Sequence, residues 1–370
     1  CKEQLGSISD SMLPLSGTVA KMGAARGNLR ERQEELSAER RKLFNVVMEL
    51  KGNHRVFARV RPFNEKEKAA EPSGEATVTF SDDFKVSVFE AGAAAKRRWF
   101  EVEKAFQLKS AQSDVFEEVK PLATSVLDGY SACVFAYGQT GSGKTYTMTG
   151  SDAQPGVSVR VLRELFRIKE ERRLEIDIQI SLLATEICNE AVRDLLVPSA
   201  DKQKKLEVVK GPDGTASVPG LIERPCQTPE EALKAMEEAA SNRAAMSAEP
   251  NGEPSRSHGI VQVRALSTSK TSGRTRVGKL NLVDLAGSEA DIDKSLSALG
   301  GVLAGLVAKN PQVPFGDSKL TMVLQDSLGG DAKTVTIVQI SPSQANAAES
   351  LSSLGFASRA RNAEPGKAKR

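Results

Sequence analysis

The chain has 370 residues, a formal net charge of +3 and 39% hydrophobic residues. A charge so close to zero does not identify nucleic acid or a membrane surface as a partner, and any acidic partner must be met by a local basic face. We find neither an apolar run long enough to cross a bilayer nor the pattern of a signal peptide, and we therefore expect a soluble cytoplasmic protein.

The four cysteines, Cys1, Cys133, Cys188 and Cys226, are scattered along the sequence. Their spacing matches neither a metal site nor a disulfide framework, as is typical of a reducing compartment. We expect all four to be chemically inert. Because the chain opens on Cys1 rather than Met, we also expect it to be the C-terminal piece of a longer protein.

Residues 28–51 are highly charged, lack glycine and proline, and carry leucines at a seven-residue spacing that predicts a coiled-coil seam. The leucines are Leu29, Leu36, Leu43 and Leu50. An amphipathic helix packed on its own domain fits this spacing equally well, because the companion positions Gln33, Arg40 and Val47 are mostly polar. Glycines lie upstream, so we expect a firm helix only from about Gly27 onward.

Gly52 and Asn53 end this helix, and we divide the chain into an N-terminal segment and neck at 1–51, a main domain at 52–362 and a loose tail at 363–370. Strands are predicted at 54–60, 76–80, 132–137, 175–187, 259–266, 279–285 and 334–341. Helices are predicted at 112–128, 144–149, 158–168, 229–246 and 318–328. This alternation indicates a layered α/β domain.

The clearest chemical signal is the phosphate-binding pattern GQTGSGKT at 138–145, which directly follows a predicted strand. Its glycines let backbone N–H groups turn toward a phosphate, and the next helix adds its positive N-terminal end. Lys144 supplies a charge and Thr145 a ligand for Mg²⁺. We therefore predict a nucleoside triphosphate site formed by Gly138, Gln139, Thr140, Gly141, Ser142, Gly143, Lys144 and Thr145.

Two further segments follow. In 281–289, NLVDLAGSE, an apolar strand ends at Asp284, a position suited to the Mg²⁺ shell, and the nearby Gly287 has an N–H that can sense a γ-phosphate. Alone this is a plain strand-to-turn signal, but after an intact phosphate loop it indicates a switch. The segment 251–258, NGEPSRSH, reads by itself as a hydrophilic loop.

Taken in order, these three motifs resemble the signature of the kinesin motor domain. The stretches FARVRP, EICNEAVRDLL, DSKLTMVLQDSLGG and SLGFASRARN extend the resemblance over roughly residues 43–362. A coiled-coil seam that enters the motor from its N-terminal side is similar to the neck of the kinesin-14 class, whose motors travel toward microtubule minus ends. The implied fold is an α/β P-loop NTPase with a central mixed β-sheet flanked by helices and preceded by a coiled-coil neck helix.

The resemblance implies an ATP hydrolase that holds ATP or ADP with Mg²⁺. Arg59, Pro62 and Tyr146 would form the shelf for the adenine, and Asn251 would belong to the same pocket. The metal would be ligated by Thr145 and Ser255 and contacted through water by Asp284.

The resemblance also implies how the switches act. Gly287 would sense the γ-phosphate, and a salt bridge between Arg256 and Glu289 would close the two switches and organise the attacking water. With Ser255, these residues are the predicted catalytic set.

The implied partner is the microtubule, contacted by residues around 312–328 with Lys319 as the best-matched cation. The junction at Gly52 and Asn53 would anchor a neck that pairs with a second copy or with a different chain. Nucleic acid and membranes are not expected as partners. The expected place is the cytoplasmic microtubule cytoskeleton, including the spindle.

The sequence departs from the family pattern at several positions. Pro254 replaces a serine, Gly316 and Met322 replace arginines, and the segment after Glu289 is shorter than usual. Pro254 leaves open a module that binds nucleotide but hydrolyses it poorly, acting as a tether or partner subunit. A P-loop ATPase acting on nucleic acid is the weaker alternative, since we find no stripe of aromatic and basic residues.

Overall fold

The computed structural model describes residues 2–72, 74–90, 96–198, 206–211, 215–247, 257–288, 294–308, 310 and 312–361, with side chains described from residue 18 onward apart from those of residues 247 and 307. A nine-stranded sheet forms the centre, in the order β11-β7-β12-β13-β6-β14-β1-β5, with β8 paired to β7. Its strands are β1 (His54–Val60), β5 (Lys104–Phe106), β6 (Ser131–Tyr137), β7 (Ile176–Cys188), β8 (Ala191–Asp194), β11 (Arg224–Cys226), β12 (Ser257–Ser269), β13 (Thr275–Asp284) and β14 (Lys333–Ile340).

This sheet is mixed, as the sequence predicts. The pairs β1–β5, β1–β14, β14–β6 and β6–β13 are parallel, whereas β13–β12, β12–β7, β7–β8 and β7–β11 are antiparallel. Two small sheets lie outside it. They are formed by β2 (Val78–Asp82), β3 (Lys85–Glu90) and β4 (Lys96–Glu101), and by β9 (Val209–Lys210) with β10 (Ala216–Ser217).

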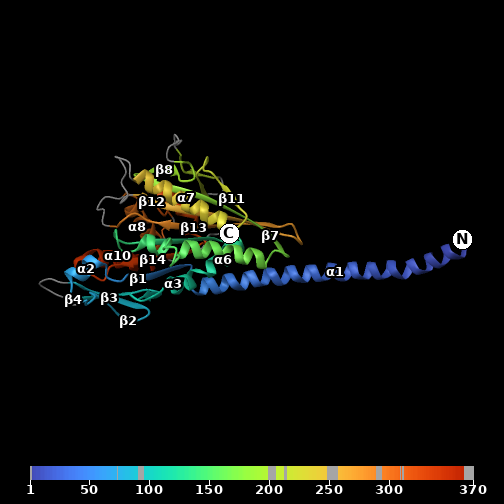
Figure 1. Cartoon of the computed structure of the whole chain (residues 1–370), viewed down its shortest axis with the longest axis horizontal. Helices are drawn as coiled ribbons and strands as arrows, with labels where there is room; N and C mark the ends of the chain where they lie inside the picture. The colour runs from blue at the N-terminus through green and yellow to red at the C-terminus, as the bar shows by residue number, and fades with distance from the viewer. Residues whose placement is uncertain are drawn as a thin grey trace.

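Helices flank the central sheet (Figure 1). The helical segments are α1 (Lys2–Leu50), α2 (Glu65–Ala70), α3 (Gln112–Val119), α4 (Pro121–Leu127), α5 (Lys144–Met148), α6 (Val157–Glu171), α7 (Pro229–Ser247), α8 (Lys294–Val307), η2 (Phe315–Asp317), α9 (Lys319–Leu328), η3 (Gln344–Asn346) and α10 (Ala347–Arg361). The helix predicted at 112–128 is in fact two helices, because Pro121 starts α4 and has no N–H to continue α3. No described helix has the length and apolar character that crossing a membrane requires.

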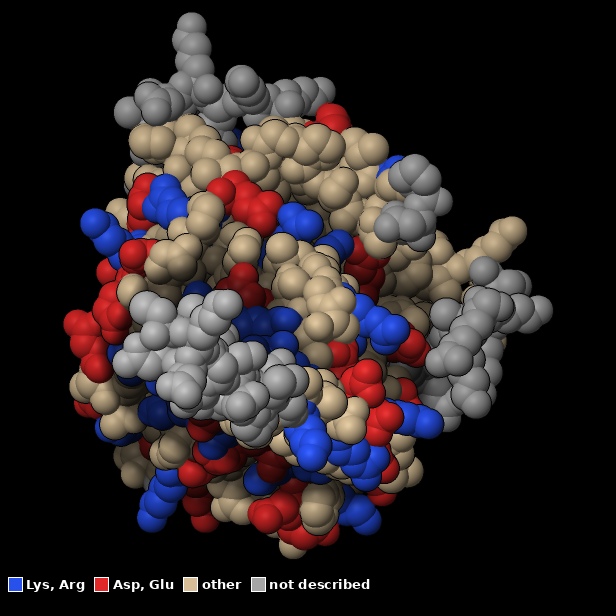
Figure 2. Space-filling model, turned by 90° about the vertical axis from the view of Figure 1, so that its right-hand side faces the viewer, with Lys and Arg blue, Asp and Glu red and all other residues tan. Residues whose placement is uncertain are grey.

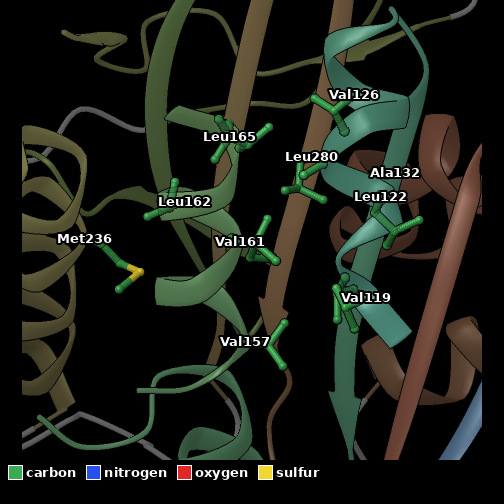
Figure 3. Packing of buried hydrophobic residues seen from close by; sticks show 14 of the residues in the cluster. Val119, Leu122, Val126, Ala132, Val157, Val161, Leu162, Leu165, Met236 and Leu280 are labelled. Carbon is green, nitrogen blue, oxygen red and sulfur yellow. The ribbon is translucent and has the colours of Figure 1, made fainter. Parts of the chain in front are cut away.

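Two apolar cores form on the two sides of the sheet. One contains buried residues of α3, α4, α6 and α7, whose packing against Leu280 of β13 is visible in Figure 3. The other contains buried residues of α8, α9 and α10. Central β6 contributes to both, with Val134 in the first core and Cys133 and Phe135 in the second, because successive side chains of a strand point to opposite faces. This double burial fixes the strand from which the phosphate loop emerges.

The N-terminal helix α1 extends well beyond the body of the molecule (Figure 1). The prediction that the helix is firm only from Gly27 is wrong, since α1 is continuous from Lys2 and passes through Gly23 and Gly27. Glycine lowers helix stability by about 1 kcal/mol relative to alanine but does not forbid the helical conformation. The chain therefore remains helical across these positions.

Both predictions for α1, a helix packed on its own domain and a coiled-coil seam, fit the structure, each on a different face of the helix. On one face Met48 is buried and Phe44 packs against the first core. On the other face the seam leucines are exposed. Their exposed fractions are 71% for Leu29, 50% for Leu36, 58% for Leu43 and 83% for Leu50. The main domain covers one side of α1, and the leucine seam remains exposed.

A shared carboxylate joins α1 to the main domain. The buried side chain of Asp128, just after α4, accepts a hydrogen bond from Arg40 of α1 at 2.9 Å and another from Arg172 after α6 at 2.8 Å. Burial lowers the pKa of Arg172, and the carboxylate counteracts this effect. Arg40, predicted as a seam position, therefore bonds to the main domain.

Basic and acidic side chains are interspersed over the end of the molecule from which α1 projects (Figure 2). Among the residues coloured there, neither sign of charge dominates the face. This distribution agrees with the small net charge of the chain. Binding of an acidic partner must therefore rest on particular side chains.

Candidate active site

The phosphate-binding loop connects β6 to α5. Three of its glycines have positive φ angles, 145° at Gly138, 74° at Gly141 and 104° at Gly143, which L-residues with side chains rarely adopt. A Cβ atom added to Gly138 would lie 2.5 Å from the carbonyl oxygen of Gln339. Glycine is thus required at Gly138 both for its backbone angle and for its close contact with β14.

Lys144 begins α5 with its side chain buried in the loop. Its Nζ donates hydrogen bonds to the carbonyl oxygens of Gly138 and Gln139, each at 2.8 Å. The ammonium group is therefore already held within the loop. Residues Thr140, Gly141, Gly143, Lys144, Thr145 and Tyr146 line a recess of about 270 Å³ together with Arg243 and residues 284–287.

The end of β13 lies beside the phosphate loop. Asp284 is level with Ala136 of β6 in a parallel pair, so the carboxyl ends of the two strands meet there. Asp284 Oδ2 accepts a hydrogen bond from the hydroxyl of Thr145 at 2.9 Å. Its Oδ1 is buried and accepts no hydrogen bond from the described part of the chain. The predicted metal residues Thr145 and Asp284 are thus adjacent.

These two side chains fit Mg²⁺. A hydroxyl and a carboxylate supply the oxygen ligands that this hard cation prefers, and the buried Oδ1 is an acceptor that still lacks a donor. Within the described ranges no group of three or more His, Cys, Asp or Glu residues is placed to hold a metal.

Arg243 is a site residue that sequence reasoning missed. From α7 its guanidinium donates to Asp284 Oδ2 at 3.0 Å and to the backbone oxygen of Ser257 at 2.8 Å. A Cβ atom on Gly259 would lie 2.6 Å from the Arg243 guanidinium, so the missing side chain makes room for it. Its one signal in the sequence is its place in the helix that precedes the segment 251–258.

The switch region is tied directly to the phosphate loop. The N–H of Ser288, next to Gly287, donates to the carbonyl oxygen of Gly138 at 3.1 Å. The N–H of Ala286 lies 3.1 Å from Nδ1 of His258 on β12. Gly287 therefore lies beside the loop, held on one side by Gly138 and on the other by β12.

The predicted adenine shelf is partly assembled. The Arg59 guanidinium lies 5.5 Å from the centre of the Tyr146 ring and donates to Gln112 and Thr147 at 2.8 and 2.9 Å. Burial lowers the pKa of Arg59. The buried Arg59 lies on the interior side of the half-exposed Tyr146 ring and supports it. Pro62 is exposed just beyond the end of β1.

A second arginine supports the loop from outside, and sequence reasoning missed it too. Arg61 Nε donates to the carbonyl oxygen of Gly141 at 2.8 Å, and both its terminal nitrogens bind the carboxylate of Glu67 on α2. This pairing, with a backbone hydrogen bond from Asn64, lowers the pKa of Glu67 to about 2. Ser341 and Asn346 also donate to Glu67.

Four predicted site residues lie outside the described residues. They are Asn251, Ser255, Arg256 and Glu289. Pro254 and the shortened segment after Glu289, up to the start of α8 at Lys294, are likewise outside them. Their roles stay predictions.

The predicted partner surface at 312–328 is formed by η2 and α9, and the structure places α8 beside them. We call it the α8–α9 face and define it by Lys294, Ser297, Gly301, Ala304, Ala308, Gly316, Asp317 and Lys319, all exposed except the half-buried Lys319. Gly316 has open space where a Cβ would be. Met322 differs from expectation, because it is half-buried and packs against the second core. A charged side chain at Met322 would therefore disturb packing.

Comparison with known proteins gives similarity over nearly the whole chain. A family model described as the kinesin motor domain matches residues 59–363. The chain is 40% identical over 369 residues to kinesin-like protein KIN-14E of Oryza sativa subsp. japonica, covering 96% of the chain and 34% of that protein. It is 43% identical over 350 residues to KIN-14Q of Arabidopsis thaliana, covering 90% of the chain and 29% of that protein. The chain thus spans about a third of the length of these relatives.

Two solved structures agree with this similarity. A fast kinesin is 36% identical with a TM-score of 0.78, over 86% of this chain and 93% of that one. The C-terminal motor and motor homology domain of Kar3Vik1, fused to a synthetic heterodimeric coiled coil, is 31% identical with a TM-score of 0.79, over 97% of this chain and 98% of that one.

Proposed function

Since this chain belongs to the kinesin motor family, we propose that it hydrolyses ATP and uses the free energy to move along microtubules, toward their minus ends as expected of the KIN-14 class. The observation that carries the proposal is the meeting of Thr145 and Asp284 beside the phosphate loop, with Lys144 held within that loop. A triphosphate, a hard cation and a water molecule need this combination of groups.

Within the pocket, each described residue has a defined task. The loop N–H groups and Lys144 bind the phosphates. When a phosphate binds, the Lys144 ammonium gives up its hydrogen bonds to the carbonyl oxygens of Gly138 and Gln139. Thr145 and Asp284 would hold Mg²⁺, which when bound neutralises negative charge on the phosphates. Arg243 orients the Asp284 carboxylate from the side of α7. Tyr146, supported by Arg59, stacks on the adenine.

The switch residues complete the proposed mechanism. Gly287 precedes Ser288, whose N–H donates to the carbonyl oxygen of Gly138 in the loop. The N–H of Gly287 is therefore close enough to the loop to detect a bound γ-phosphate. We assign Ser255 to the metal, Asn251 to the nucleotide pocket, and the pair Arg256 and Glu289 to the attacking water. Catalysis then consists of positioning and of charge stabilisation.

The exposed leucine seam of α1 supports a coiled-coil partner. Its four leucines lie on one helix face, and each is at least 50% exposed. Exposure of this apolar surface to water is unfavourable, and a second helix that binds there would cover it. The polar companion position Gln33 weakens a homodimer, so we favour a different chain as partner. Sedimentation of this chain at low micromolar concentration checks this, and a fully formed homodimer would contradict it.

Steady-state ATPase assays with and without microtubules test the main proposal. We expect a large stimulation by microtubules, and gliding of polarity-marked microtubules with their plus ends leading. Stimulation by single-stranded DNA in place of microtubules would overturn the assignment of partner. Plus-end-directed movement would overturn the direction and leave the ATPase intact. We place the working protein on the microtubule cytoskeleton, including the spindle.

A further inference from the structure

The α8–α9 face carries little charge. In the described residues of 294–328, the cations are Lys294 and Lys319 and the anions are Asp317 and Asp326. The exposed positions between Lys294 and Ala308 are filled by small uncharged residues. Among the described residues of this stretch, attraction to an acidic surface therefore depends on these two lysines.

Lys319 is engaged within the chain. Its Nζ forms an ion pair with the carboxylate of Glu207, from the segment just before β9. The Lys319 side chain is 25% exposed and that of Glu207 is 53% exposed. A second ion pair involves α9, where Lys279 of β13 binds Asp326 at 3.2 Å. Each pair places a carboxylate against a cation on this side of the molecule.

The backbone at Lys319 is fixed in a way that maintains this pairing. Glu190, in the turn between β7 and β8, accepts a hydrogen bond from the Lys319 N–H at 2.8 Å and another from the Ser295 hydroxyl at 3.0 Å. Asn189 and Glu190 have φ angles of 50° and 61°, which are unfavourable for residues other than glycine. The turn thus holds the N-terminal ends of α8 and α9 together. This fixes the backbone of Lys319 where its side chain reaches Glu207.

We propose that Glu207 competes with the microtubule for Lys319, so that binding of the acidic filament surface must displace this carboxylate. The inference rests on the proposed function, because it concerns the same partner surface. A half-exposed ion pair is weak, so the microtubule can displace Glu207. The free energy that Lys319 contributes to microtubule binding is nevertheless lowered by the free energy of the broken pair. Glu207 thereby lowers affinity without touching the nucleotide pocket.

A double-mutant cycle on the full chain tests the proposal. Co-pelleting affinity for microtubules at low salt is measured for the wild type, Glu207→Gln, Lys319→Gln and the double variant. Glu207→Gln should tighten binding about two- to fivefold, the range expected for loss of an exposed ion pair. In the Lys319→Gln background the same change should have almost no effect, because the cation it would release is absent.

Asp317→Asn is the matched control. It removes one negative charge from the same face, two residues from Lys319, so it measures the long-range contribution of charge alone. A Glu207→Gln effect that equals that of Asp317→Asn, or that persists without Lys319, would overturn the competition while leaving the motor assignment intact. If no variant binds microtubules and the ATPase is not stimulated, both the inference and the proposed function fail.

Discussion

The phosphate-binding loop is formed by backbone geometry, whereas the α8–α9 face depends on side-chain charge. In the loop, glycines with positive φ and a close contact with β14 set the shape, so any sequence that meets these constraints forms it. On the α8–α9 face, Lys319 is present but is paired with Glu207. Geometry of the backbone can be inferred from a motif, but availability of a charge depends on its neighbours.

The largest expected effect is that of Lys144→Ala. Affinity for ATP should fall by at least about a hundredfold, because the variant loses the buried ammonium that we propose binds the triphosphate, and the loop backbone cannot replace its charge. Titration with a fluorescent nucleotide measures it, and Lys42→Ala on the exposed side of α1 is the control. Retained affinity would mean that backbone geometry alone suffices, which would sharpen the contrast between the two regions.

Pro254→Ser should accelerate hydrolysis by roughly a hundredfold, because proline lacks both the hydroxyl and the N–H that serine offers, and loss of one preorganised donor costs about 3 to 4 kcal/mol in well-studied hydrolases. Single-turnover hydrolysis measures the chemical step, with nucleotide binding followed separately. Equal rates for the two proteins would show that Arg256 and Glu289 position the water without help.

Glu67→Gln tests whether the loop depends on a charge as well. The folded-state pKa of Glu67 is about 2, below its usual value of 4.5, so its stabilisation is complete above about pH 4.5 and is lost as pH falls toward 2. We expect the variant to be less stable by up to about 3 kcal/mol at pH 7, and the difference to shrink markedly at pH 3.

Urea unfolding at pH 7, 5 and 3 measures this difference, with Glu65→Gln, an exposed carboxylate on the same helix, as the control. A pH-independent difference would assign the effect to packing. That result would mean that the phosphate loop depends on backbone geometry and not on the charge of Glu67.

The smallest expected effect is that of Gly316→Arg. Open space surrounds the missing Cβ, so the arginine is tolerated and adds one cation to the α8–α9 face. Microtubule affinity should rise severalfold at low salt and converge with the wild type at high salt. Unchanged co-pelleting at low salt would show that the surface has been placed wrongly. Met322 is unsuitable for the same change because it packs against the second core.

Features defined by local sequence were predicted well. The phosphate loop, the strand that ends at Asp284 and the central sheet follow from short motifs and from apolar patterns, and the structure confirms the fold. The strand predicted at 76–80 corresponds to β2, but its partners β3 and β4 and the break at Pro121 were missed, because turn residues there compete with weak strand and helix patterns.

Contacts between distant charged residues were not predictable. Arg243 lies 41 residues from Asp284, and Lys319 lies 112 residues from Glu207. With 51 basic and 48 acidic residues in the chain, sequence spacing cannot select which pairs form. Only the fold, by bringing α7 next to β13 and α9 next to the segment before β9, makes the choice.

The carboxylate of Asp128 bears on how reversibly the neck can detach. A buried carboxylate that loses every cation is destabilised by several kcal/mol. Asp128 binds Arg172 of the motor as well as Arg40 of α1, so it keeps one cation if α1 leaves. Release of the neck then exposes the apolar contacts of Met48 and Phe44 and breaks the hydrogen bond that Ser272 donates to Glu34. The helix can therefore come off and return without stranding a charge in the interior.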